Sequence, residues 1–276
     1  MKPSRNAFFA KHLLAAGASC LILVPFLWMV STSLKDPVEV VLRDPTILPR
    51  TFEVENYGRV FSRGRFGDYF LNSIMVSTAT TLICVTLATL SGYAFARYRL
   101  PGGKPLLFGI LATQMFPEIL LAIPLYVLLR NLGLLDSLLG LILVYTTFAL
   151  PFCVWMLRNY FMAIPRDLDD AAIVDGATRL QALRTVILPV AVPGIIATAL
   201  FSFILSWNEF FYANTFISTR DRQTVSVGLQ SLIGEFTTDW GLLMAGAVVT
   251  TAPVVAVFFF VQRFLTQGLA AGAVKG

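Results

Sequence analysis

The segment Asp169–Pro189 reads DDAAIVDGATRLQALRTVILP and lies between two long apolar runs. Its first part combines acids with alanines, and acids in the first turn of a helix stabilise the positive end of the helix dipole. Gly176 suits the turn at which such a helix ends, because glycine tolerates a left-handed backbone. The segment therefore predicts a short helix up to Gly176 and a second one over Thr178–Thr185, both at the membrane surface.

The composition of the whole chain is that of a membrane protein. Of its 276 residues, 57% are hydrophobic and 13% are charged, and the mean hydropathy is +0.74. Soluble domains have about 25% charged residues. The net charge of +5 comes from basic residues between the apolar runs, which form no basic block, so we expect no nucleic-acid partner.

Six apolar segments are long enough to cross a bilayer as helices, which takes about 20 residues each. Barrel strands are excluded because they would be about 10 residues long and would alternate in polarity. We read the first segment as a retained span, because it lacks a clear signal-peptide cleavage site. The sequence thus predicts an all-α polytopic membrane protein with spans near Leu13–Ser33, Tyr69–Phe95, Leu106–Leu129, Leu138–Tyr160, Val186–Trp207 and Leu242–Phe264.

The basic residues of the short loops predict the orientation. Lys2, Arg5 and Lys11 precede the first span, and the loop Arg97–Lys104 carries three basic residues and no acid. Arg158, Arg166, Arg179 and Arg184 flank or lie within the loop between spans four and five, whereas the short opposing loop has only Arg130 beside it. The loop Lys35–Asp68 has six basic and six acidic residues and carries less weight because of its length. The positive-inside rule then places both termini in the cytoplasm.

Catalytic chemistry has little support in this sequence. His12 is the single histidine, and the three cysteines lie in separate apolar runs, where a packing role is the simplest interpretation. A zinc site or a histidine-based active site is therefore nearly excluded. No Walker A pattern occurs, so this chain supplies no nucleotide site.

Four polar residues are weak candidates for a translocation pathway. Gln114 and Glu118 lie in span three, where an acid is costly unless it faces a cavity, a partner or the outer interface. Pro117 in the same span, together with Pro124, predicts a kink. Asn208 and Glu209 begin the segment Asn208–Trp240, whose mixed polarity predicts a loop that partly re-enters the bundle or contacts an external partner.

The segment Asp169–Pro189 resembles the E-A-A-x-x-D-G-A…I-x-L-P loop of the permease subunits of bacterial ABC importers. Asp170 stands where the family usually has Glu, which keeps the charge but shortens the side chain by one methylene. Other stretches look like the carbohydrate branch, of the maltose-transporter type: Ser33-Leu34-Lys35, Asn72-Ser73, Tyr93–Tyr98, Trp207–Phe210 and the ending Gly272–Gly276.

The resemblance implies a type I ABC importer permease fold in which this loop is the coupling helix. The coupling helix docks into a cytoplasmic ATPase, and closure of two ATPase subunits rocks the permease between inward- and outward-facing states. The residues it implies for ATPase coupling are Asp170, Ala171, Ala172, Asp175, Gly176, Ala177, Leu188 and Pro189.

The resemblance also implies a set of partners. These are a second permease subunit forming a heterodimer, two copies of the ATPase, which bind the ATP and Mg, and an extracytoplasmic solute-binding protein. No cofactor is expected in this chain, and the subunit is expected not to be an enzyme.

We therefore expect a permease subunit in the bacterial inner (plasma) membrane that imports a sugar or sugar-like solute of oligosaccharide, polyol or glycerol-phosphate type. We expect one permease domain over residues 1–276. It comprises the first span and external loop (1–66), a five-span core (67–264) with the coupling loop 165–189, and a cytoplasmic tail (265–276). The alternative is a stand-alone secondary transporter of a small solute, which predicts several titratable residues at mid-bilayer.

Overall fold

The computed structural model describes residues 5–44, 46–62, 65–234 and 237–273, and these residues form helices and loops without strands. Among the described residues, five helices are long and apolar enough to span a membrane. They are α1 (Arg5–Ser33), α4 (Phe66–Arg97), α7 (Leu138–Ala163), α10 (Leu188–Asn208, which continues the helix from Arg179) and α13 (Trp240–Ala273). They match five of the six predicted spans.

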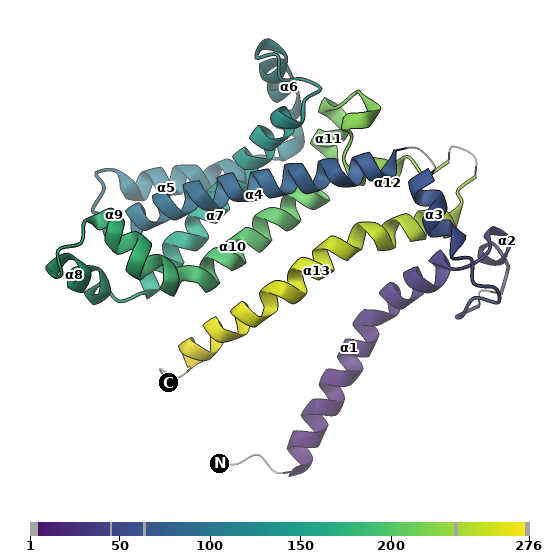
Figure 1. Cartoon of the computed structure of the whole chain (residues 1–276), viewed down its shortest axis with the longest axis horizontal. Helices are drawn as coiled ribbons and strands as arrows, with labels where there is room; N and C mark the ends of the chain where they lie inside the picture. Colours follow the sequence, from purple (N-terminus) through teal and green to yellow (C-terminus); the bar gives the residue numbers. More distant parts are fainter. Residues whose placement is uncertain (1–4, 45, 63–64, 235–236, 274–276) are drawn as a thin grey trace. The chain divides into compact units, whose positions relative to one another are not determined.

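The remaining predicted span is broken into two helical pieces (Figure 1). Helix α5 (Gly103–Ala112) continues as the 3-10 turn η1 (Thr113–Met115), and η2 (Glu118–Leu121) leads into α6 (Ala122–Asn131). The two pieces meet at an angle of 93°.

Pro117 explains this break through its effect on the backbone of the preceding residue. Phe116 is extended, with φ −76° and ψ 130°, which is the conformation that a following proline favours. The kink predicted at Pro117 is thus confirmed, but it is sharp enough that the segment is two helices and not one bent span. Pro124 leaves α6 intact because it lies in the first turn, where no helical hydrogen bond is lost.

The chain divides into two compact units, and the first comprises residues 1–66 and 228–252. The described part of its loop after α1 carries two short helices, α2 (Pro37–Val40) and α3 (Glu55–Ser62). The buried amide of Asn56 donates to the carbonyl oxygens of Ser33 and Lys35, at 3.1 and 3.2 Å. Arg59 forms an ion pair with Asp239 at 2.5 Å. These contacts fasten the loop to the ends of α1 and α13.

The second unit comprises residues 67–227 and 253–276 and contains the two apolar cores. Helices α7 and α10 pack closely there, and a Cβ on Gly194 would lie 2.4 Å from the ring of Tyr160. Cys84 and Cys153 are fully buried in one core, which confirms their packing role, while Cys20 is exposed.

Most of the segment expected to be a tail is helical. Helix α13 continues to Ala273, so most of residues 265–276 extend the last helix. Lys2 and residues 274–276 lie outside the described residues.

Candidate coupling loop and translocation site

The triplet Asp175-Gly176-Ala177 follows a short helix, α8 (Asp167–Val174). The amide of Ala177 donates to the carbonyl oxygen of Ala172, and that of Gly176 donates to Ile173, both at 3.0 Å. This pair of bonds is a Schellman motif, which needs a left-handed residue after the helix. Gly176 supplies it with φ +86°. The predicted helix and its glycine stop are confirmed, and three acids lie in the first turn as expected.

The second predicted helix is not a separate element. Thr178 and Gln181 form a capping box that starts α9 (Arg179–Ala182). The helix then passes through a π-helical stretch, η3 (Leu183–Ile187), directly into α10. The prediction of a helix ending at Thr185 was wrong because Pro189 falls in the first turn of α10, where its missing N–H causes no break.

A buried ion pair attaches α8 to the end of α4. Arg97 Nε lies 2.9 Å from Asp169 Oδ2, and the Tyr93 hydroxyl donates to Asp169 Oδ1 at 2.5 Å. The side chains of Arg97 and Asp169 are only 6% and 10% exposed. A charge pair at this depth holds its position because either partner alone would be a buried, uncompensated charge.

Backbone contacts reinforce the same attachment. Arg97 Nη2 donates to the carbonyl oxygen of Ile164, and Arg166 Nη2 donates to that of Ala96, at 3.1 and 3.2 Å. The guanidinium of Arg179 lies over the ring of Tyr98, 5.0 Å from its centroid. The loop is therefore held to α4 on both sides of α8.

Sequence reasoning missed the role of Asp169 and its partners. It named Asp170 for contact with the ATPase, and that acid is exposed, but it gave Asp169 no role of its own. The available signal was the arginine at the end of span two, since a charge there needs either water or a partner from a neighbouring loop.

The other predicted coupling residues divide into exposed and buried groups. Ala172 is buried, and Leu188 and Ala177 are half-buried. Asp170, Ala171, Asp175, Gly176 and Pro189 are exposed. Large apolar side chains near them are also exposed, namely Leu168 (36%), Ile173 (43%), Val174 (86%) and Leu180 (50%). The loop thus presents an apolar surface with acids beside it.

Three of the four pathway candidates line one cavity of about 380 Å³. Glu118, Asn208 and Glu209 come from η2 and the end of α10. Aromatic side chains complete the lining, namely Tyr145, Phe148, Phe210, Phe211 and Tyr212. Gln114 lies outside this set, and its amide donates to the carbonyl oxygen of Phe148 at 2.9 Å.

Helix α11 (Phe211–Phe216) brings these residues together. Its Tyr212 stacks on Phe148 with ring centroids 5.1 Å apart, and the Tyr212 hydroxyl donates to the carbonyl oxygen of Glu118 at 2.6 Å. The carboxylate of Glu209 accepts the amides of Tyr212 and Ala213 at 2.8 and 3.1 Å. The prediction that part of the segment after Asn208 returns to the bundle is confirmed by the burial of Tyr212 and Phe216.

Metal chemistry has no support in the part of the chain that the structure describes. No group of three or more His, Cys, Asp or Glu side chains there is placed to hold a metal ion.

Comparisons with known proteins agree with this geometry. Residues 85–271 match the family described as binding-protein-dependent transport system inner membrane component. The trehalose transport system permease protein SugB of Mycobacterium tuberculosis is 40% identical over 256 residues, covering 92% of this chain and 93% of SugB. The trehalose/maltose transport system permease protein MalG of Thermococcus litoralis is 35% identical over 285 residues, covering 99% of each chain.

A solved structure shares the fold. A chain of a bacterial ABC transporter involved in the import of the polysaccharide alginate superposes with a TM-score of 0.80 at 24% identity. The match covers 95% of this chain and 98% of the other.

The fold and the site define a permease subunit of an ABC importer, a multi-pass protein of the inner membrane. The chain belongs to the family of binding-protein-dependent transport system inner membrane components. As such it is a non-catalytic subunit that works in a complex with a periplasmic binding protein and an ATPase. The predicted family, fold class and importer function are confirmed, and the alternative of a stand-alone secondary transporter was wrong.

Proposed function

We propose that this subunit couples an ATPase to solute movement through the loop Asp169–Pro189. The observation that supports this most is the buried pair Asp169–Arg97, which ties the exposed apolar surface of α8 to the membrane helix α4. A force applied to α8 by a docked partner would then be transmitted to α4, because separating the pair would leave two buried charges uncompensated.

The exposed surface of α8 has the composition of a docking site for the ATPase. Leu168, Ile173 and Val174 offer apolar area, and Asp170 and Asp175 add negative charge at its edge. An apolar centre with a charged rim is the usual anatomy of a protein interface. The expected occupant is a cleft on each of two ATPase copies that bind ATP and Mg, one docked on this subunit and one on a second permease subunit. In this proposal both termini lie in the cytoplasm, and residues 1–276 act together as one permease domain made of the two compact units.

The proposed cargo is a sugar or sugar-like solute. The cavity beside α11 combines aromatic faces with the carboxylates of Glu118 and Glu209 and the amide of Asn208. Aromatic faces pack against the C–H surface of a sugar ring, and carboxylates and amides accept and donate hydrogen bonds to hydroxyl groups. The names of the relatives, which are trehalose and trehalose/maltose permeases, support the same class.

Uptake by the reconstituted importer tests the cargo site. Glu118→Gln and Glu209→Gln are expected to raise the KM for solute in proteoliposomes that contain the ATPase, the second permease and the loaded binding protein. Arg130→Gln is the control, because Arg130 does not line this cavity. Unchanged kinetics in both acid variants would remove these residues from the pathway.

A further inference from the structure

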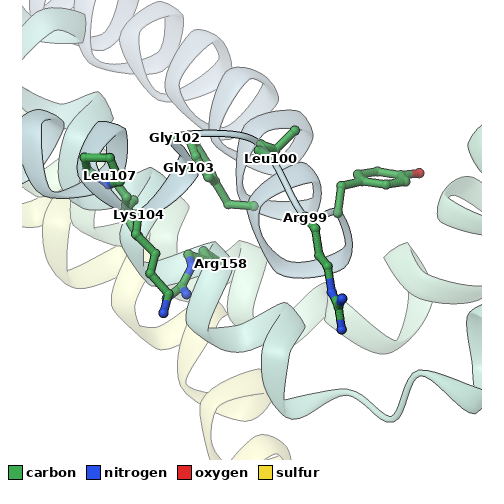
Figure 2. Close-up of a pocket in the computed structure, with 10 residues that line it drawn as sticks. Arg99, Leu100, Gly102, Gly103, Lys104, Leu107 and Arg158 are labelled. Atoms are coloured by element: carbon green, nitrogen blue, oxygen red, sulfur yellow. The ribbon is translucent and has the colours of Figure 1, made fainter.

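A second cavity, of about 450 Å³, lies at the junction of α4, α5 and α7 (Figure 2). Arg99 follows α4, Lys104 lies in the first turn of α5, and Arg158 lies on α7. Figure 2 shows these three cationic side chains around the same hollow. The proposed coupling loop and cargo cavity do not use them.

The charged residues that line this cavity are all positive. Its residues include three cations and no carboxylate. Arg158 Nη1 donates to the neutral amide oxygen of Asn159, at 3.2 Å. Cations gathered without acids repel one another, so an anion placed among them gains from all three.

Glycines shape the hollow. A Cβ on Gly92 would lie 2.9 Å from the backbone nitrogen of Arg158, so this glycine lets α4 approach α7 closely. Gly102 has φ +71° and reverses the chain between α4 and α5. The turn therefore lets Arg99 and Lys104, which come from its two ends, line the same cavity as Arg158.

The rest of the lining is apolar, with Phe95, Leu100, Pro105 and Leu107 among its members. Beyond it, Leu106 and Phe108 of α5 are 56% and 73% exposed. Because α5 belongs to a membrane segment, this exposed apolar face suits contact with acyl chains.

We propose that this cavity binds the phosphate headgroup of an anionic phospholipid, with the acyl chains along the exposed face of α5. Basic pockets between membrane helices are suited to such headgroups. Free inorganic phosphate would satisfy the cations but would leave the apolar wall and the α5 face without a ligand. The structure thus favours the lipid as the source of the phosphate. A bound lipid would hold the α4–α5 turn, whose neighbour Arg97 holds α8.

Native mass spectrometry of the assembled importer tests the proposal. The complex is purified in detergent and titrated with phosphatidylglycerol or with phosphatidylcholine. The complex is expected to retain phosphatidylglycerol in preference to phosphatidylcholine. The affinity for phosphatidylglycerol is expected to fall about fivefold in each of Arg99→Gln, Lys104→Gln and Arg158→Gln, and further in the triple variant that combines them. Arg130→Gln, which removes a charge elsewhere in the chain, is expected to leave retention unchanged.

Three results would overturn it. Equal retention of the two lipids, or unchanged retention in the triple variant, means that these cations serve membrane topology alone. Complete displacement of the lipid by millimolar inorganic phosphate means that the site takes a free anion. If the triple variant does not assemble, Lys104→Gln is tested alone, because Lys104 is exposed. Unchanged retention of phosphatidylglycerol in that variant would then overturn the proposal.

Discussion

The contrast between two adjacent acids, Asp169 and Asp170, gives the sharpest prediction. Both lie in the first turn of α8 and share the same favourable interaction with the helix dipole. Asp169 is buried against Arg97 and Tyr93, whereas Asp170 is exposed. Replacing each acid by asparagine keeps the shape and removes one charge, so the difference between the variants isolates the buried pair.

The structure sets the size of the effect. Asp169→Asn leaves the guanidinium of Arg97, only 6% exposed, without its counter-charge. Removing one partner of a buried ion pair costs about 3–5 kcal/mol. Asp170 is exposed, so Asp170→Asn is expected to change the stability by no more than about 0.5 kcal/mol. Restoring neutrality with Arg97→Gln in the Asp169→Asn background is expected to recover part of the loss.

Hydrogen exchange in the purified complex measures this difference directly. The amides of α8 report the local opening of the loop. A cost of about 3 kcal/mol raises their exchange by roughly 150-fold in Asp169→Asn, while Asp170→Asn remains near the wild-type rate. Equal exchange in the two variants would refute the argument that the Asp169–Arg97 pair holds α8 to α4.

Two further predictions concern the loops. Gly176→Ala is expected to destabilise α8 by about 1–2 kcal/mol, because the backbone φ of Gly176 is +86°. The same hydrogen-exchange experiment measures this loss. The control is Gly109→Ala in the interior of α5, where the added methyl group meets no atom within 4 Å and is expected to be neutral or slightly stabilising. A lack of destabilisation by Gly176→Ala would contradict the Schellman turn. For Asp136, partial burial raises the pKa, but hydrogen bonds from Thr219 and Ser218 outweigh it and hold the pKa below its ordinary value. This contribution to stability is present above about pH 4 and is lost as the pH falls through the lowered pKa. Thermal unfolding is therefore expected to show a smaller effect of Asp136→Asn below that range than at pH 7, and an effect that does not change with pH would count against it.

The sequence determined the spans well because their lengths and polarity are local properties. A run of about 20 apolar residues can only be a helix in lipid, and five of the six predicted spans are continuous helices in the structure. The kink at Pro117 was also predictable, since proline acts on its immediate neighbours. The continuity of α9, η3 and α10 could not be predicted. From sequence alone, a proline in the first turn of a helix cannot be distinguished from a proline that separates two helices.

The site depended on contacts between distant residues. Asp169 and Arg97 are 72 positions apart, and Glu118 meets Tyr212 across 94 residues. Nothing in the spacing of either pair marks it. The apolar residues of α11 signalled only that the segment after Asn208 is partly buried, and the cavity formed with Glu118 follows from where α11 packs. The sequence therefore indicated Glu118 and Glu209 as candidates, but it did not indicate that they line the same cavity.

Cross-linking from α8 tests the proposed coupling surface most directly. Val174, which is 86% exposed, is replaced by cysteine after Cys20→Ser has removed the exposed native cysteine, and a benzophenone maleimide is attached. Illumination of the assembled importer is expected to join Val174→Cys to the ATPase. The matched Leu132→Cys, which is 60% exposed beyond the end of α6, is expected to give no such product. An ATPase adduct from Leu132→Cys alone, or none from Val174→Cys, would contradict the account.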